Sequence, residues 1–301
     1  RLATHPRPNN TPFDYLQKKP GYYFSEAELI NNIYKELNML PGHRHPLAYI
    51  MEAAADISYG LADIEDAVEK DVLNVAQVLE GLRNEVEELK GDLDAKSFSG
   101  MRYGSPLSFN ELLDEAESSY NKETIDKANK FFVRLRVLVH NNLCRYAAKR
   151  FVDNFDAVVS GHYNGALLED DSSEHKMCAA LKNLANKKVF TAPEVIQEEL
   201  RGHRIIHGLL DTYEPLLRLR YDDFTGIAND EREPIKRNPL CTRLFQKLPG
   251  KHVRAYLEAM KKHPDNPLIE RYYRCRLLQD YISGMTDQFA YDEYRSLNVS
   301  D

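Results

Sequence analysis

The sequence predicts an all-α fold, and three observations carry this prediction. Apolar residues recur at three- and four-residue steps through most of the chain, which is the period of a helix with one buried face. Several of these segments begin at a capping residue and end at glycine or proline. Few stretches alternate with the period of two that a half-buried strand requires, and no fixed-period repeat is present.

Composition narrows the class of protein. The chain has 301 residues, of which 43% are hydrophobic and 29% charged, as in ordinary globular proteins. Its formal charge of −7 argues against a surface built entirely for nucleic acid. The apolar runs are far shorter than the ~20 residues that span a bilayer, so we expect no membrane partner. The four cysteines form no C-x-x-C pair and indicate reduced thiols in a cytoplasmic protein.

The first residues predict an extended segment that leads into a helix. Four prolines within residues 1–24 deny a helix there, so we expect a strap lying on another surface. Ser25 is the expected cap of a first helix, which ends near Pro41. Because the chain begins with Arg1 and not Met, we expect it to be a piece of a longer protein.

Residues 25–93 are predicted to hold further helices of one core. A second helix begins at Pro46, and Asn74 caps a third that closes at Gly91. The second helix has an apolar stripe at three- and four-residue steps, formed by Ile50, Ala54, Ile57, Leu61 and Ile64.

A loop over residues 94–107 separates this group from a C-terminal helical region over residues 108–301. The pair Ser108 and Glu111 is a capping box that opens the region. A second pair of this kind, Thr191 and Glu194, opens a later helix. The periodic segments lie at residues 122–159, 173–187, 191–209, 251–261 and 267–285, and the segment 216–240 is predicted to be irregular.

Few motifs in the chain point to chemistry by themselves. It has no glycine-rich phosphate loop, no H-E-x-x-H pair and no G-x-S-x-G elbow. Glu199, His203 and His207 lie one helical turn apart and share a face. Such a row supplies three of the four ligands of a typical zinc site, so a solvated or partly packed face is the simpler interpretation.

Four segments together resemble a known family. They read MEAAADISYGLADIEDA at residues 51–67, YYRCRLLQDYISGMTD at 272–287, KKPGYY at 18–23 and SGHYNGALLED at 160–170. In these segments the chain resembles the bacterial deoxyguanosine triphosphate triphosphohydrolases (dGTPases), a branch of the HD-domain phosphohydrolases. The resemblance runs from end to end and implies that the chain is the C-terminal helical portion of such an enzyme.

The resemblance implies an activity and partners. Family members hydrolyse dGTP to deoxyguanosine and inorganic triphosphate with a divalent metal, Mg²⁺ or Mn²⁺, held by two histidines and two aspartates. It also implies a ring-like homo-oligomer, a hexamer, and some members bind single-stranded DNA, which a net charge of −7 does not favour. None of the ten histidines is followed by aspartate, so the family's His-Asp doublet is absent. We therefore expect no catalytic residue in this chain.

The remaining metal aspartate is also missing. In the family it stands four residues before the tyrosine that corresponds to Tyr59, and here that position is Ala55. A methyl group cannot ligate a metal ion. Engineered inactivation, natural loss and replacement by Asp56 are the three explanations, and we favour the first because the surrounding residues follow the family pattern. Asp56 points about 100° away from Ala55 on a helix, which disfavours replacement.

The resemblance assigns substrate contacts to six residues. The family's equivalents of Tyr59 and Asp63 contact the deoxyribose and its 3′-hydroxyl, whereas from the residues alone a core tyrosine and a solvated aspartate are the simpler interpretation. Lys19 matches a lysine that contacts the triphosphate and is otherwise an exposed lysine before a turn. The base-reading positions are Glu199 and Arg232, and the position that reaches a neighbouring subunit's site is Arg243, otherwise a surface arginine at a helix end.

Three hypotheses follow for the chain. In the first it supplies sugar and base recognition to a dGTP hydrolase and is inactive as written. In the second it is a non-catalytic deoxynucleotide-binding module for regulation or assembly, which Ala55 and the absent doublet favour. In the third it is a helical scaffold without a preference among nucleotides.

Overall fold

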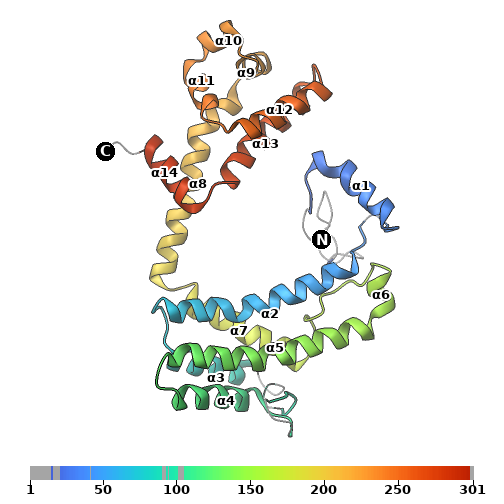
Figure 1. The fold of residues 1–301 in the computed structure, drawn as a ribbon, viewed down its shortest axis with the longest axis vertical. Helices are drawn as coiled ribbons and strands as arrows, with labels where there is room; N and C mark the ends of the chain where they lie inside the picture. Colours follow the sequence, from blue (N-terminus) through green and yellow to red (C-terminus); the bar gives the residue numbers. More distant parts are fainter. Residues whose placement is uncertain are drawn as a thin grey trace. The chain divides into compact units, whose positions relative to one another are not determined.

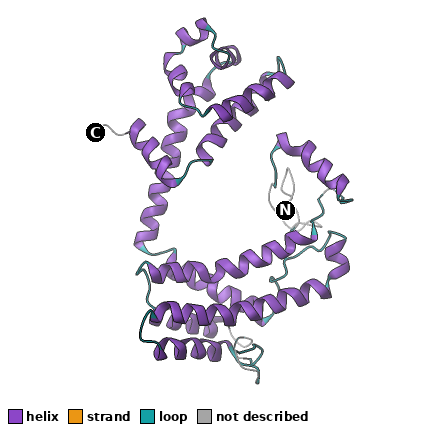
Figure 2. Cartoon of the chain, in the orientation of Figure 1, coloured by secondary structure: helices purple, strands orange, loops and turns teal. Residues whose placement is uncertain are grey.

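The computed structural model is helical wherever it forms regular structure, which confirms the all-α prediction (Figure 2). It describes residues 15, 21–40, 42–89, 93, 95–100 and 105–298. Within those ranges no strand is present, and an isolated bridge between Phe98 and Leu107 is the only β-type pairing. Most of the predicted strap lies outside the described residues. Over the same ranges, no helix is both long and apolar enough to cross a bilayer.

The helices are named as in Figure 1. The N-terminal ones are η1 (Phe24–Glu26), α1 (Ala27–Glu36), α2 (Pro46–Glu69), α3 (Val75–Leu89), α4 (Phe109–Lys122), α5 (Lys127–Asp153), α6 (Phe155–Val159), α7 (Ser173–Leu184) and the π-helical turn η2 (Ala185–Val189). The remaining ones are α8 (Pro193–Arg218), α9 (Tyr221–Ala228), α10 (Arg232–Arg237), α11 (Pro239–Gln246), α12 (Gly250–Lys262), α13 (Pro267–Ser283) and α14 (Asp287–Asn298).

The chain forms two compact units, residues 1–195 and 196–301. The boundary falls in the first turn of α8, inside the range 108–301 that the sequence analysis treated as one region. The predicted division of the chain into a strap, a helical group, a loop and a C-terminal region stays a prediction. Each unit is described by itself below.

Unit 1 is built around α2, which packs against α5, α7 and the π-helical turn. The apolar face of α2 was predicted partly in error, because Ile50 and Ala54 are exposed. The buried stripe begins one residue earlier and consists of Tyr49, Ala53, Ile57, Leu61 and Ile64. Shifting the start by one residue still satisfies the three- and four-residue step, so sequence periodicity alone did not choose between the two.

Two of the four predicted capping residues are confirmed in detail. Gln77 N–H donates to Asn74 Oδ1 at 3.0 Å, and Glu111 N–H donates to Ser108 Oγ at 3.2 Å. The helix predicted at Thr191 and Glu194 is present as α8, which begins at Pro193, but the Thr191 hydroxyl donates to the Lys187 carbonyl oxygen at 2.7 Å and does not cap it. Ser25 is likewise no cap, since it lies inside η1, for which Tyr23 is the N-cap residue.

The predicted single helix over residues 122–159 is wrong. Helix α4 ends at Lys122, and the chain breaks again at Asn154, between α5 and α6. Asp126, at the N-cap of α5, has a left-handed backbone with φ 52°, which interrupts a continuous helix. Unit 1 therefore contains a helical hairpin, in which α4 packs against α5.

Unit 2 is more helical than its sequence predicts. The segment 216–240 was predicted to be irregular, but it contains the end of α8, all of α9 and α10 and the beginning of α11. Pro215 lies inside α8, three residues before its end. Helix α14 was not predicted, and it packs closely on α8, where a Cβ on Gly208 would lie 2.2 Å from the Tyr294 ring.

The periodic segment predicted at residues 267–285 is confirmed as α13. Leu277, Leu278, Tyr281 and Ile282 are buried in the core of unit 2. The core also contains a charged pair, since Arg274 Nη2 and Glu270 Oε2 are 2.6 Å apart and both side chains are almost fully buried. Arg274 Nη1 donates to the carbonyl oxygens of Leu216 at 3.2 Å and Leu219 at 2.6 Å, so it ties α13 to the C-terminal end of α8.

Candidate functional site

The predicted sugar-contact residues line a small pocket on the surface of unit 1. Tyr59 and Asp63 share it with Asp56 from the same helix, and its volume is about 200 Å³. The Tyr59 side chain is 69% exposed, so the interpretation as a core tyrosine is wrong. The full lining is Asp56, Tyr59, Gly60, Asp63, Lys182, Ala185, Asn186 and Phe190.

Helix α2 presents this wall because its two faces differ in polarity. Residues 56, 59, 60 and 63 follow the helical step and share a face, while the stripe that includes Ile57, Leu61 and Ile64 is buried. The buried stripe fixes the rotation of α2 about its axis. The polar side chains of the pocket are consequently held by the apolar packing behind them.

The opposite wall of the pocket comes from α7 and the π-helical turn that follows it. Lys182, Asn186 and Phe190 line this wall, and sequence reasoning assigned none of them. A π-helical turn is rare and occurs frequently at functional sites. Helical periodicity predicted an ordinary helix ending at residue 187, so the bulge that brings Asn186 and Phe190 to the pocket had no signal in the sequence.

Asp56 is paired across the pocket with a lysine. Lys182 Nζ lies 3.6 Å from Asp56 Oδ1, and the two side chains are 52% and 32% exposed. Cys178 lies one turn before Lys182, and burial raises the pKa of its thiol to about 12, with Lys182 lowering and Asp56 raising it. At neutral pH this cysteine is therefore a protonated thiol and not a nucleophile.

The residues present do not fit a metal centre. Ala55, at the position of the family's metal aspartate, offers no ligand atom, and Asp56 is engaged by Lys182. Across the residues that the structure describes, no group of three or more His, Cys, Asp or Glu side chains is arranged to hold a metal ion. A divalent ion with hard oxygen ligands has no complete site on this part of the chain.

A second polar cluster joins α2 to α5. The His140 ring hydrogen-bonds to the backbone of Ile57, and burial together with the nearby charge of Arg136 lowers the pKa of His140. Arg136 itself forms an ion pair with Glu65 of α2. These contacts join the middle of α2 to α5, next to the turn of α2 that carries Tyr59.

The predicted base-reading residues lie in unit 2 on three different helices. Glu199 is on α8, Arg232 begins α10 and Arg243 is in the last turn of α11, and all three are exposed. Among the ion pairs of the described residues, none joins Glu199 to either arginine. Arg243 Nη1 donates to Gln246 Oε1 at 3.2 Å, which also suits a surface arginine at a helix end.

Within unit 1 the structure brings Tyr59 and Asp63 together. Glu199 lies six residues before Ile205, the first α8 residue in the core of unit 2. Lys19 lies outside the described residues. The His203 and His207 rings stack with centroids 3.8 Å apart, His207 Nδ1 lies 2.9 Å from the His203 carbonyl oxygen, and both residues are exposed, as expected for a solvated helix face.

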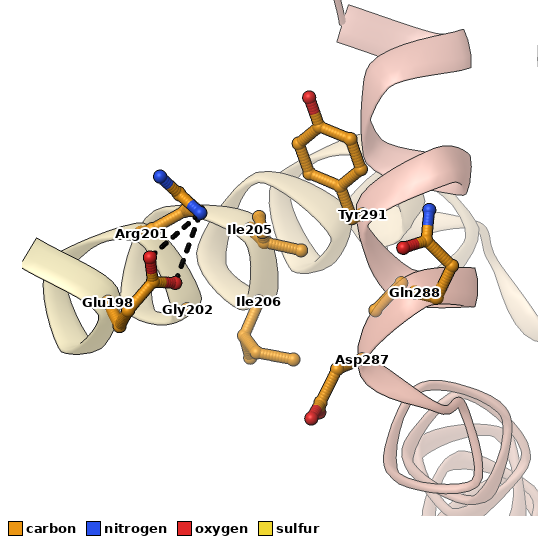
Figure 3. A pocket seen from close by; sticks show the side chains of 9 residues that line it. Glu198, Arg201, Gly202, Ile205, Ile206, Asp287, Gln288 and Tyr291 are labelled. Atoms are coloured by element: carbon orange, nitrogen blue, oxygen red, sulfur yellow. Dashed lines mark hydrogen bonds and ion pairs between the residues drawn. The ribbon is translucent and has the colours of Figure 1, made fainter. Parts of the chain in front are cut away.

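A larger groove of about 680 Å³ lies elsewhere in unit 2, between α8 and α14 (Figure 3). Ile205, Ile206 and Tyr291 line its apolar part, and the ion pair of Glu198 with Arg201 borders it at 2.9 Å. Glu199 is not among the lining residues, because one step along a helix turns a side chain by about 100°. Size alone therefore does not identify the site of the predicted chemistry.

Comparison with known proteins finds triphosphohydrolases that are similar to the chain. No protein-family model matches it. A deoxyguanosinetriphosphate triphosphohydrolase of Klebsiella pneumoniae is 45% identical over 289 residues, which cover 94% of this chain and 54% of that protein. The chain is homologous to these triphosphohydrolases. One from an Enterobacter species is 45% identical over 290 residues, and a probable one from Pseudomonas aeruginosa is 43% identical over 310.

The triphosphohydrolase relatives are longer than this chain. It spans 54–59% of their length, while the matches cover 94–99% of the chain itself. The resemblance predicted from four short segments is therefore confirmed along nearly the whole sequence. These fractions are consistent with a chain that corresponds to the C-terminal part of a triphosphohydrolase.

Proposed function

We propose that the protein to which this chain belongs hydrolyses dGTP to deoxyguanosine and inorganic triphosphate, and that the chain supplies recognition of the sugar and the base. The observation that carries the proposal is the 43–45% identity to triphosphohydrolases over 94–99% of the chain. The pocket on α2 adds independent support, because it brings together two residues that the family resemblance assigns to the deoxyribose.

Sugar recognition rests on Tyr59 and Asp63. An ionised carboxylate only accepts hydrogen bonds, so Asp63 suits a hydroxyl donor such as the 3′-hydroxyl of a deoxyribose. The exposed ring of Tyr59, one turn away, offers an apolar surface against the sugar. A 2′-hydroxyl placed against that ring would lose its water without gaining a partner, which disfavours ribonucleotides.

Base recognition rests on Glu199 and Arg232, with Arg243 reaching the site of a neighbouring subunit. A carboxylate accepts from the N1 and N2 hydrogens of guanine, and an arginine donates to O6 and N7. Adenine presents neither pattern and would leave these groups unpaired. That both arginines are exposed agrees with a role at a surface where a ligand or another subunit completes the contacts.

Bond cleavage is assigned to groups that this chain does not supply. The family's Mg²⁺ or Mn²⁺ ion offsets charge on the phosphate when it is bound, but the residues here do not complete its site. The chain alone therefore binds the deoxynucleoside part of the substrate and leaves the phosphate ester intact.

Release of triphosphate tests this proposal. The 301-residue chain with dGTP and Mn²⁺ is expected to release no triphosphate above a blank. A protein extended by the N-terminal portion of a triphosphohydrolase relative, with Ala55→Asp, is expected to release it. An inactive extended protein that is folded and binds dGTP would count against a catalytic function.

A non-catalytic deoxynucleotide-binding module is the second candidate, and Ala55 is the observation that favours it. Under that function the extended protein stays inactive, yet the chain still prefers dGTP to dATP. A scaffold would show neither activity nor preference.

Further properties are proposed with the activity. We assign the protein to the cytoplasm and expect it to form a homo-oligomer, a hexamer. Single-stranded DNA is a further candidate partner. Unit 1 contains 23 basic and 30 acidic side chains and unit 2 contains 17 of each, so the formal charge of −7 lies in unit 1. Any contact with a nucleic acid backbone is accordingly expected on unit 2.

A further inference from the structure

Lys182 is a cation in the α2 pocket to which no role is assigned. It projects from α7, across the pocket from α2, and no other Lys or Arg is among the lining residues. The same lining contains the carboxylates of Asp56 and Asp63. The pocket thus has two acidic groups and one ammonium group.

The ammonium group of Lys182 is only loosely engaged. Its 3.6 Å separation from Asp56 exceeds a hydrogen-bond distance, and the lysine side chain is 52% exposed, so this pair contributes little to stability. Lys187, on the π-helical turn, contrasts with it, because its Nζ lies 2.6 Å from both Glu85 and Glu88. Lys182 therefore keeps donor positions available for a ligand, whereas Lys187 is committed to the fold.

The pocket has a direction along α2. Asp63 and Asp56 are seven residues apart, which is about 10.5 Å along the helix axis, and Tyr59 lies between them. With the 3′-hydroxyl of a deoxyribose at Asp63 and the sugar against Tyr59, the 5′ side of the ligand points toward Asp56 and Lys182. That is also the end at which Ala55 occupies the position of the family's metal aspartate.

We propose that Lys182 contacts the 5′ phosphate of a deoxynucleotide whose sugar lies against Tyr59 and Asp63. A phosphate at this end is repelled by Asp56 and attracted by Lys182 alone among the lining residues. The ammonium group then moves from a weak ion pair to a charge-assisted hydrogen bond with a phosphate oxygen. The inference rests on the proposed function, since it takes the sugar orientation from there.

The first test compares dGTP with deoxyguanosine, which lacks phosphate. Lys182→Met is expected to weaken binding of dGTP to the chain by about tenfold, measured by titration calorimetry with EDTA present, and to leave deoxyguanosine binding unchanged. Lys188→Met is the matched control, because Lys188 is an exposed lysine on the π-helical turn that follows α7 and does not line the pocket. Lys182→Arg is expected to retain most of the dGTP affinity.

A second variant separates direct contact from an indirect effect through Asp56. If Lys182 acted only by offsetting the Asp56 charge, Asp56→Asn combined with Lys182→Met would restore dGTP binding. The proposal predicts that the loss persists in this double variant. Restoration, an equal loss for both ligands, or no loss for dGTP would each overturn it. If the unaltered chain bound neither ligand, the proposed sugar recognition would fail first, and this inference would fail with it.

Discussion

The cores of the two units differ in the charged groups that they enclose. Unit 1 buries Arg44 and Glu85, each paired with a more exposed partner, Glu52 and Lys187. The apolar stripe of α2 in unit 1 packs against buried side chains such as Phe131 and Leu181. The core of unit 2 instead encloses the ion pair of Glu270 with Arg274, and Tyr256 OH donates to Glu270 Oε1 at 2.9 Å. The pocket on α2 is therefore held mainly by apolar packing, and the helices of unit 2 are held in part by buried charge.

This difference bears on Arg232, assigned to the base, and on Arg243, assigned to the site of a neighbouring subunit. Arg243 lies on the short helix α11, whose Phe245 packs edge-on against Phe224 with ring centroids 5.7 Å apart. The Arg274 guanidinium lies 4.2 Å from the centroid of the same Phe224 ring. Isolated helices of this length are not stable, so α10 and α11 depend on such contacts. We infer that substitutions in the core of unit 2 impair recognition of the base more than substitutions in the core of unit 1 impair recognition of the sugar.

The largest expected effect comes from breaking the buried pair. Arg274→Met leaves the Glu270 carboxylate buried without its partner and is expected to destabilise unit 2 by about 3–5 kcal/mol. Hydrogen exchange resolved along the chain should show the loss in residues 196–301 and not in unit 1. Arg83→Met is the control, since this exposed ion-paired arginine of unit 1 contributes about 0–1 kcal/mol. Equal losses in the two variants would contradict the contrast between the cores.

Recovery of stability sharpens that prediction. The double variant Glu270→Leu with Arg274→Met removes both charges together and should regain most of the lost stability. A double variant as unstable as Arg274→Met would mean that the carbonyl contacts to Leu216 and Leu219, and not the unpaired carboxylate, dominate the loss.

The next effect in size concerns the sugar. Asp63→Asn keeps the shape of the side chain but removes the charged acceptor, so deoxyguanosine binding to the chain should weaken about tenfold. The free energy of unfolding should stay nearly unchanged, because Asp63 lies on the polar face of α2. Asp66→Asn, on an exposed position of the same helix that does not line the pocket, should change neither quantity. Calorimetric titration and urea denaturation provide the two measurements.

A smaller effect is expected for the base. Glu199→Ala should lower the preference of the chain for dGTP over dATP by about three- to tenfold, as for one hydrogen bond at an exposed position. Glu198→Ala removes the neighbouring carboxylate, which borders the groove between α8 and α14, and should leave the preference as it is. An unchanged dGTP to dATP ratio in Glu199→Ala would remove Glu199 from the base-reading set.

The smallest effect is a pH dependence in unit 1. Burial lowers the pKa of His140, so the unfolded chain takes up this proton first as the pH falls below about 6.5. Unfolding is then favoured, and stability declines by less than about 1.4 kcal/mol per pH unit until the folded His140 is protonated too. His140→Gln should reduce the difference in unfolding free energy between pH 7.5 and 5.5. An identical difference in both proteins would show that other groups cause the decline.

The sequence predicted the fold class and much of α2, because long periodic segments and capping residues act locally. Asn74 and Ser108 cap their helices through contacts only three residues away, which a sequence pattern can specify. The same local reasoning misplaced Ile50, since Tyr49 and Ile50 both satisfy the helical step and only packing against the rest of unit 1 selects one. Periodicity likewise did not predict that the ring of Tyr59 is exposed.

The unpredicted parts depend on contacts distant in sequence. The C-terminal end of α8, beyond Pro215, is held by Arg274, whose guanidinium donates to the carbonyl oxygens of Leu216 and Leu219. Asn186 and Phe190 reach the pocket through a π-helical turn that no periodic signal distinguishes from an α-helix. Family resemblance predicted residues of one wall of the pocket, and only the three-dimensional structure revealed the residues of the other wall.

The central claim is that this chain recognises a deoxyguanosine nucleotide without the metal centre. Equilibrium titration of the 301-residue chain with dGTP, dATP and GTP in the presence of EDTA tests it most directly. The account predicts saturable binding of dGTP, with weaker binding of both dATP, through the base, and GTP, through the 2′-hydroxyl at Tyr59. Equal affinity for the three nucleotides, or no binding of any of them, would contradict this claim. The chain would then be a helical scaffold without a preference among nucleotides.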